Sequence, residues 1–260
     1  MLYLRPHAKI NLGLFIKGKR EDGYHLLETL MYPVLELQDH LWIEVGGARC
    51  EFELDGPALP GDPRDNLCVK AWKALKAVVP ELPGVRIRLR KEIPAGAGLG
   101  GGSSDAAFVL RGLAELCQVR GGEALLHEVA ATLGADVPFF LKDIPQMASG
   151  TGTDLNPFSL SFPYLLKVFP QPIHSSTIAA YRRLDYTQFD PQRSLEQVLS
   201  QSVEHWKDKL HNDLEVPVFD MYPQLRQRKQ QLYQEGALYA SMSGSGSAMF
   251  ALFAKEEESQ

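Results

Sequence analysis

Residues 91–107 read KEIPAGAGLGGGSSDAA, and five glycines fall within positions 96–102. Glycine has no Cβ, so the backbone N–H groups of such a loop can approach a ligand closely. A helix-like run follows directly, and the free N–H groups and the positive dipole end at its N-terminus would face the same ligand. Ser103 and Ser104 add hydroxyls that can bind phosphate oxygens or a hydrated Mg²⁺. The stretch therefore predicts a cradle for a polyphosphate at the start of a helix.

Two other interpretations of this stretch are weaker. Gly96, Gly98 and Gly101 satisfy the dinucleotide-binding pattern G-x-G-x-x-G, which requires a preceding strand that is buried on both faces. The preceding run at 85–91, VRIRLRK, instead alternates apolar residues with arginines, which is typical of a sheet with one face in water. A flexible hinge capped by Ser103 would not need so many glycines.

The composition narrows the class of protein. The chain has 260 residues and a net charge of -5, with no basic block, so nucleic acid is not an expected partner. No apolar run approaches the roughly 18 residues of a membrane helix, so no membrane partner is expected. Cys50, Cys68 and Cys117 are far apart and lack a metal-binding spacing, which is typical of reduced thiols. We expect a cytoplasmic protein that is a monomer or a weak homodimer.

Hydrophobic periodicity predicts strands and helices without a regular βαβ alternation, which favours the α+β class. In the strand expected at 8–17, Lys9 and Asn11 share a face that is predicted to be exposed. The composition changes to Ser, Thr, Gly and Pro around 150–164, which predicts two domains, 1–155 and 156–260. The other expected strands lie around 41–45, 50–54, 85–91, 164–169, 237–242 and 248–253; the expected helices lie at 65–78, from 103 onward, up to 134, from 136 onward, within 175–210 and at 222–234.

Seven motifs, in order along the chain, resemble those of the GHMP kinases, a superfamily of small-molecule kinases. They are AKINLGLFIKGKREDGYHLLETL at 8–30, DNLC at 65–68, the glycine loop, LGADVPFFL at 133–141, HSSTIAAY at 174–181, HNDLE at 211–215 and SMSGSGSAMF at 241–250. The resemblance implies a two-domain α+β fold. Its N-terminal domain would be ribosomal protein S5 domain 2-like and bind ATP, and its C-terminal domain would be ferredoxin-like.

The same resemblance implies a catalytic pair, Lys9 and Asp136. Asp136 would take the proton from the substrate hydroxyl, while Lys9 would keep Asp136 ionised and help to neutralise charge on the γ-phosphate. Phosphoryl transfer depends mainly on positioning and electrostatics, so two charged groups beside a phosphate cradle suffice. The implied cofactors are ATP and Mg²⁺. The implied ATP-binding residues are Asn66, Pro94, Ala95, Gly96, Ala97, Gly98, Leu99, Gly100, Gly101, Gly102, Ser103 and Ser104.

The implied acceptor is an alcohol on a small molecule that carries a cytidine diphosphate. Asn11 would contact this substrate, and Tyr24 and His25 would bind the cytosine, with His25 reading its edge through hydrogen bonds. Tyr181 would stack on the other side of the base, since every base presents a π-face to an aromatic ring. Without the motif context, Tyr24, His25 and Tyr181 would more often be ordinary turn and helix residues.

The chain departs from the family pattern after PFFL. Lys142 and Asp143 stand where the family usually has paired glycines, and Thr153 stands where it has a glutamate. We therefore expect the loop beside the substrate to differ from that of relatives. No carboxylate is obviously dedicated to Mg²⁺, and Ser104, Asp136 and the phosphates of ATP themselves are the candidates.

The resemblance thus implies an ATP-dependent kinase that phosphorylates a cytidyl diphosphate substrate. Three alternatives stay open at this point. The first is another GHMP kinase of the homoserine or mevalonate type, which would not need the aromatic clamp around a base. The second is a catalytically silent nucleotide-binding protein on the same fold, and the third is a dinucleotide oxidoreductase.

Overall fold

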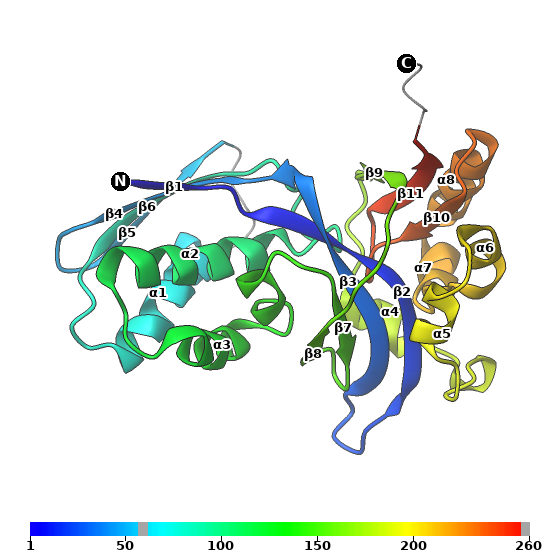
Figure 1. Ribbon diagram of the computed structural model, residues 1–260, viewed down its shortest axis with the longest axis horizontal. Helices are drawn as coiled ribbons and strands as arrows, with labels where there is room; N and C mark the ends of the chain where they lie inside the picture. Colours follow the sequence, from blue (N-terminus) through cyan, green and yellow to red (C-terminus); the bar gives the residue numbers. More distant parts are fainter. Residues whose placement is uncertain (57–61, 256–260) are drawn as a thin grey trace. The chain divides into compact units, whose positions relative to one another are not determined.

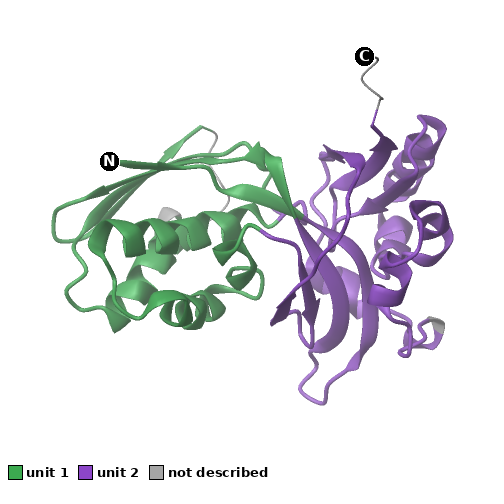
Figure 2. Ribbon diagram, in the orientation of Figure 1, with its two compact units in different colours: residues 1–9, 33–95, 100–143 green, residues 10–32, 96–99, 144–260 purple. Residues whose placement is uncertain are grey.

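The computed structural model describes residues 1–56 and 62–255 (Figure 1). The chain divides into two compact units, shown in different colours in Figure 2. The first unit combines residues 1–9, 33–95 and 100–143, and the second combines residues 10–32, 96–99 and 144–260. Each compact unit therefore combines segments that are distant in the sequence. The two consecutive domains expected from the sequence, 1–155 and 156–260, stay a prediction.

The first unit is built on a four-stranded sheet with the order β1-β4-β6-β5. Strand β4 pairs in antiparallel fashion with β1 and β6, and β5 pairs with β6 in parallel. In β6 the apolar side chains are at most 1% exposed and the arginines between them are exposed, as the alternation predicts. The strands are β1 (Leu2–Leu4), β4 (His40–Val45), β5 (Cys50–Asp55) and β6 (Val85–Arg90).

Two helices, α1 and α2, pack on one face of this sheet, and a third, α3, packs against both of them (Figure 1). They follow the apolar periodicity of the sequence, and Asn66 caps the first of them by accepting a hydrogen bond from the Cys68 N–H at 2.9 Å. The third helix ends at Gly134, as expected. The helical segments of this unit are α1 (Leu67–Val78), α2 (Gly101–Cys117), α3 (Gly122–Leu133), and the 3₁₀ turns η1 (Pro63–Asp65) and η2 (Pro138–Leu141).

The second unit contains a three-stranded sheet, β10-β11-β9, which is antiparallel throughout. A buried apolar cluster joins this sheet to α7 and α8, and it includes Met242, Val218 and Leu225. The strands are β9 (Tyr164–Phe169), β10 (Tyr239–Met242) and β11 (Met249–Ala254); the helical segments are α4 (Thr177–Arg182), η3 (Tyr186–Gln188), α5 (Leu195–Leu199), η4 (Val203–His205), α6 (Trp206–Lys209), α7 (Glu215–Met221) and α8 (Pro223–Gln234).

Another four-stranded sheet has the order β2-β3-β7-β8. Its strands are β2 (His7–Lys19), β3 (His25–Gln38), β7 (Gln146–Ser149) and β8 (Asp154–Pro157). One face of β2 was predicted to be exposed, and this prediction is wrong, because Lys9 is only 4% exposed and Asn11 only 3%. Each has polar partners inside the protein: a carboxylate for Lys9, and two hydroxyls for Asn11.

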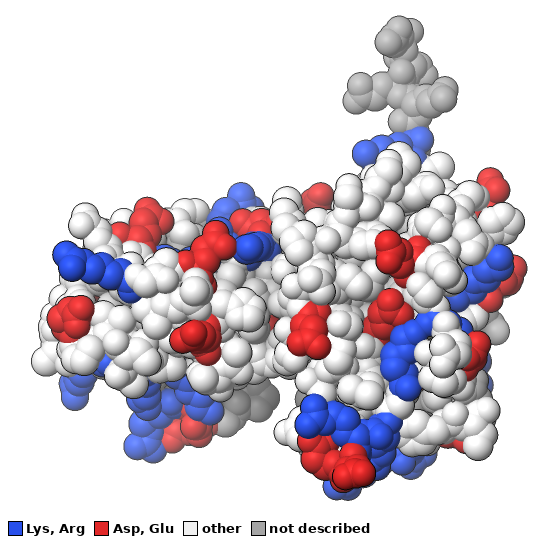
Figure 3. All heavy atoms as spheres, turned by 60° about the horizontal axis from the view of Figure 1, so that its bottom comes forward, with Lys and Arg blue, Asp and Glu red and all other residues white. Residues whose placement is uncertain are grey.

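The surface carries both signs of charge. On the face shown in Figure 3, lysine and arginine are interspersed with aspartate and glutamate among the described residues, in keeping with the small net charge of the chain. None of the helices in the described ranges is both long and apolar enough to cross a membrane.

Candidate active site

Lys9 and Asp136 meet in the first unit. The Nζ atom of Lys9 is 3.3 Å from Oδ2 of Asp136, and the two side chains are 5% and 33% exposed. A buried amine is costly unless it is paired with an opposite charge, and the carboxylate supplies that charge. The candidate catalytic pair thus consists of a buried cation and a carboxylate that is still open to solvent.

The helix expected from residue 136 onward does not form. The segment after Asp136 forms only η2, a 3₁₀ turn of four residues whose N-cap position is Val137, with no side-chain cap hydrogen bond. Pro138 contributes no N–H to this turn, and the chain becomes extended again at Lys142. The Asp136 carboxylate is consequently directed to Lys9.

The phosphate-loop glycines adopt conformations that other residues rarely adopt. Gly96, Gly98 and Gly100 have φ values of +68°, +78° and +71°. In the second unit, a Cβ on Gly98 would lie 2.1 Å from the carbonyl oxygen of Ser243. The Ser243 hydroxyl donates to the Gly98 carbonyl at 2.8 Å, so the small residues at 243–247 pack directly against this part of the loop.

The glycine loop ends where α2 begins. This helix starts at Gly101, two residues before the predicted start, because Gly100 in the left-handed region turns the chain and its carbonyl accepts the first helical bond from Ser104 N–H at 2.9 Å. Ser103 therefore does not cap the helix. The Ser104 hydroxyl is fully buried and has no hydrogen-bond partner among the described residues. A buried orphan hydroxyl in the first turn of a helix fits a polyphosphate or hydrated-metal ligand.

The end of the loop also touches the catalytic strand. A Cβ on Gly100 would lie 2.7 Å from Cζ of Phe140 and 3.1 Å from Cγ of Lys9. Only a glycine leaves room for this approach. The loop end, Lys9 and the segment after Asp136 therefore pack together in the first unit.

A buried charge cluster that was not predicted from the sequence supports α2. Lys91 donates to Asp39 and, at 2.6 Å, to Asp105 on α2. Asp39 also accepts from the backbone N–H groups of Glu92 and Ile93, at 2.6 and 2.9 Å. Burial, opposed by Lys91 and reinforced by Asp39, raises the pKa of Asp105 to about 8. The cluster thus holds the segment before the loop against the helix after it.

Replacing Asp105 by asparagine is expected to flatten the pH dependence of stability. Between the pKa of an unfolded aspartate, about 4, and about 8, the folded chain binds more protons than the unfolded chain. Wild-type stability therefore falls as the pH rises through this window, by roughly 1 kcal/mol per pH unit from this group. Urea unfolding of both proteins between about pH 5 and pH 8 measures the difference. Parallel curves for the two proteins would contradict the assignment.

The second unit holds a pocket of about 530 Å³ that is lined by Tyr24, His25 and Tyr181. The His25 and Tyr181 ring centroids are 4.5 Å apart. Tyr186, which the sequence analysis missed, lies on the same pocket with its ring parallel to His25 at 6.0 Å. Three of the predicted substrate residues are thus brought together, while Asn11 lies on β2, where its side chain donates to Thr29 at 3.1 Å.

His25 is poised to bind a ligand. Its Nε2 atom is buried and has no hydrogen-bond partner among the described residues. Burial, together with the nearby Lys19, lowers the pKa of His25 below its ordinary value, so the imidazole is neutral at neutral pH. A neutral imidazole offers one donor and one acceptor, which suits the edge of a nucleobase.

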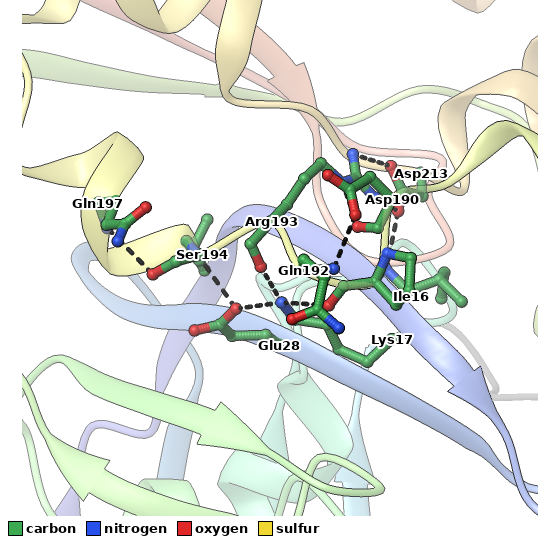
Figure 4. A network of polar contacts seen from close by, with 11 residues as sticks. Ile16, Lys17, Glu28, Asp190, Gln192, Arg193, Ser194, Gln197 and Asp213 are labelled. Atoms are coloured by element: carbon green, nitrogen blue, oxygen red, sulfur yellow. Dashed lines mark hydrogen bonds and ion pairs between the residues drawn. The ribbon is translucent and has the colours of Figure 1, made fainter.

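A polar network fixes the chain next to Tyr186 (Figure 4). Arg193 forms a two-pronged ion pair with Asp213, at 2.6 and 3.2 Å, and Asp213 also accepts from the Ile16 N–H at 2.7 Å. Lys17 on β2 pairs with Glu28 on β3 at 3.1 Å and donates to the Arg193 carbonyl. The network thus connects the segment after η3 to strands β2 and β3.

The remaining predicted ATP-binding residues are distributed over both units. Asn66, Pro94 and Ala95 belong to the first unit, and its Gly100–Ser104 stretch contains the loop end and the helix start. Residues 96–99 belong to the second unit, where the Ala248 N–H donates to the Ala97 carbonyl at 3.0 Å. The loop is thus a direct covalent connection between the units.

Comparison with protein families defines the class. The family model described as GHMP kinases N terminal domain matches residues 66–143, and that of GHMP kinases C terminal matches residues 194–260. Together these matches span more than half of the chain. Their class is that of ATP-dependent small-molecule kinases.

Individual relatives narrow the class further. The 4-diphosphocytidyl-2-C-methyl-D-erythritol kinase of Bacteroides fragilis is 44% identical over 97% of this chain and 92% of its own length. That of Parabacteroides distasonis is 42% identical over 96% of this chain and 91% of its own. The chain therefore belongs to the GHMP kinase family, within the group of 4-diphosphocytidyl-2-C-methyl-D-erythritol kinases.

Solved structures agree with this placement. A crystal structure of 4-(cytidine 5'-diphospho)-2C-methyl-D-erythritol kinase matches with a TM-score of 0.84 and 38% identity, over 96% of this chain and 90% of that one. The homoserine kinase of Cytophaga hutchinsonii matches with a TM-score of 0.69 over 98% and 88% of the two chains. At 19% identity this second similarity shows the shared fold alone. The α+β, two-domain GHMP fold expected from the sequence is confirmed.

Proposed function

We propose that this chain transfers the γ-phosphoryl group of ATP to the 2-hydroxyl of 4-diphosphocytidyl-2-C-methyl-D-erythritol, a step of non-mevalonate isoprenoid precursor biosynthesis. The observation that carries the proposal is the pocket around His25, in a chain that is 44% identical to a kinase named for this substrate. The orphan Nε2 of His25 would bind the cytosine edge, and Tyr24 and Tyr181 would flank the base. Lys19 and Arg182 line the same pocket and suit a diphosphate.

The reaction requires a base near the acceptor hydroxyl and positive charge near the transferred group. Asp136 would accept the hydroxyl proton. Lys9, paired with Asp136 at 3.3 Å, would place its positive charge beside the phosphoryl group as charge develops on its oxygens. Asn11, on the same strand as Lys9, would contact the substrate, and Asn66, at the start of α1, would lie near the base of ATP.

The glycine loop fits the phosphates of ATP. Its backbone leaves no space for a Cβ at Gly98 or Gly100, and the N–H groups of the first turn of α2 lack helical partners. Mg²⁺ would neutralise phosphate charge when bound. Ser104, with its buried orphan hydroxyl, and Asp136 are the side chains that would hold it, directly or through water.

The proposal is tested by ADP release from the purified protein with ATP and Mg²⁺, measured for the cytidyl substrate, homoserine and mevalonate. A site that hydrogen-bonds a base rejects molecules lacking it by about 10⁴-fold in kcat/KM, and we expect a preference of that order. Equal turnover of the three alcohols would contradict the proposed substrate. NAD(P) binding without ATP turnover would instead favour an oxidoreductase.

Replacing His25 by alanine is expected to raise KM for the cytidyl substrate about 10- to 100-fold, since a buried hydrogen bond to the base is lost. The KM for ATP serves as the internal control and is expected to stay within about twofold. Steady-state kinetics with each substrate varied in turn gives both values. An unchanged KM for the cytidyl substrate would remove His25 from the proposed base site.

A further inference from the structure

His7, Asp143 and Arg111 form a compact network in the first unit. His7 lies on β2 two residues before Lys9, Asp143 follows η2, and Arg111 lies on α2. The His7 Nε2 atom is 3.1 Å from Oδ1 of Asp143, and Arg111 binds both carboxylate oxygens of Asp143 at 2.7 and 3.1 Å. By the resemblance given in the sequence analysis, Asp143 stands where the family usually has one of two paired glycines. The structure shows that this carboxylate has two side-chain partners.

Both ring nitrogens of His7 face oxygen acceptors. The Nδ1 atom is 2.8 Å from the Ala8 carbonyl oxygen, and the Nε2 atom is 3.1 Å from Oδ1 of Asp143. His7 is 2% exposed, and its ring lies between the rings of Phe108 and Phe140, at 5.7 and 5.4 Å. The buried ring is therefore held in one orientation by the Ala8 carbonyl on one side and the Asp143 carboxylate on the other.

Asp143 in turn is held from a second side. The hydrogen bond from His7, together with Arg111, lowers the pKa of the Asp143 carboxyl well below its usual range. The Arg111 guanidinium stacks on Phe108, with its Cζ 4.4 Å from the ring centroid, and donates to the Phe140 carbonyl at 3.3 Å. The network therefore joins α2, the end of η2 and the start of β2.

These three segments carry the candidate catalytic groups. Strand β2 carries Lys9, the segment before η2 carries Asp136, and the start of α2 forms the end of the glycine loop. Phe140, which packs on His7, also packs against Gly100 close to Lys9. We propose that the His7–Asp143–Arg111 network positions Lys9 and Asp136 relative to the phosphate loop, which makes His7 and Asp143 positioning residues for phosphoryl transfer.

The inference rests on the proposed function, because it assigns the network to the same catalytic pair. A displacement of about 1 Å at a reacting group can lower the rate about 10²-fold, so a loosened network is expected to act on kcat. It should leave KM nearly unchanged, since none of the three residues lines the His25 pocket or belongs to the glycine loop.

The test compares Asp143→Ala, His7→Phe and the double variant with the wild type, by steady-state kinetics and thermal unfolding. We expect each single variant to lose 10- to 100-fold in kcat, with both KM values within about threefold. The double variant should lose no more kcat than the single variant with the larger loss, because both changes break the same network. Phenylalanine fills the apolar space between Phe108 and Phe140, which keeps the His7 variant folded.

Lys142→Ala is the matched control, since Lys142 adjoins Asp143 but pairs at the surface with Glu123, at 3.2 Å. It should leave kcat unchanged. An unchanged kcat in Asp143→Ala and His7→Phe, or a loss seen only in KM or only in the unfolding temperature, would overturn the inference. Absence of turnover in the wild type with the cytidyl substrate would instead overturn the proposed function.

Discussion

Replacing Asp136 by asparagine is expected to lower kcat about 10³-fold, within the usual 10²- to 10⁴-fold contribution of a general base. Asparagine has nearly the same shape and can still contact Lys9 at the position of the present 3.3 Å pair, but it does not accept the proton of the substrate hydroxyl. The loss should therefore appear in kcat and not in the affinity for ATP. Steady-state kinetics and calorimetric ATP titration measure the two quantities.

Asp220→Asn is the control for this experiment. Asp220 forms an exposed ion pair with Arg226 at 2.8 Å, and its removal should change neither quantity. If Asp136→Asn retained turnover within about tenfold of the wild type, Asp136 would not be the base. A lost ATP affinity in that variant would show that Asp136 acts through the binding of ATP and Mg²⁺ rather than as the base.

Replacing Gly98 by alanine is expected to destabilise the protein by about 3 kcal/mol or more and to raise KM for ATP. Alanine pays about 1–2 kcal/mol for a left-handed backbone, which Gly98 adopts with φ of +78°. Its Cβ would also lie 2.1 Å from the Ser243 carbonyl oxygen, so the loop or the 243–247 segment must shift. Urea unfolding and ATP-dependent kinetics report the two effects.

Gly102→Ala is a matched control in the same loop. Among the residues that the structure describes, a Cβ on Gly102 would contact only Leu67, at an ordinary 3.6 Å, and Gly102 lies inside the first turn of α2. Alanine favours a helix by about 1 kcal/mol over glycine, so this variant should be at least as stable as the wild type. Equal stability of the Gly98 and Gly102 variants would contradict the steric account of the loop.

Local patterns predicted much of the fold. The alternation in 85–91 and the apolar stripes of α1 and α8 identified these elements, and the motif order identified the family. The 14-residue strand β3 was missed, since Pro33 within it and its unbroken apolar stretches hide the period of two. The helix expected after Asp136 is only the 3₁₀ turn η2, because tertiary contacts rather than helix propensity determine the conformation of so short a segment.

The site was predictable to the extent that it follows family motifs. Lys9, Asp136 and the aromatic residues near His25 were found because each sits within such a motif. Tyr186 and the Asp39–Lys91–Asp105 cluster were not predicted, because the residues that contact each other lie far apart in the sequence. No local sequence pattern indicates such a long-range contact. Asp143 did give a signal, as a departure from the family, but its partners His7 and Arg111 required the structure.

Phosphorus NMR of the reaction products tests the central claim most directly. Purified protein, ATP, Mg²⁺ and 4-diphosphocytidyl-2-C-methyl-D-erythritol are incubated together and the phosphorus resonances are followed. The account predicts that the γ-phosphate signal of ATP is replaced by one phosphomonoester signal on the erythritol moiety, while the substrate diphosphate stays intact. Release of inorganic phosphate alone, or a phosphomonoester formed equally well on homoserine or mevalonate, would contradict it.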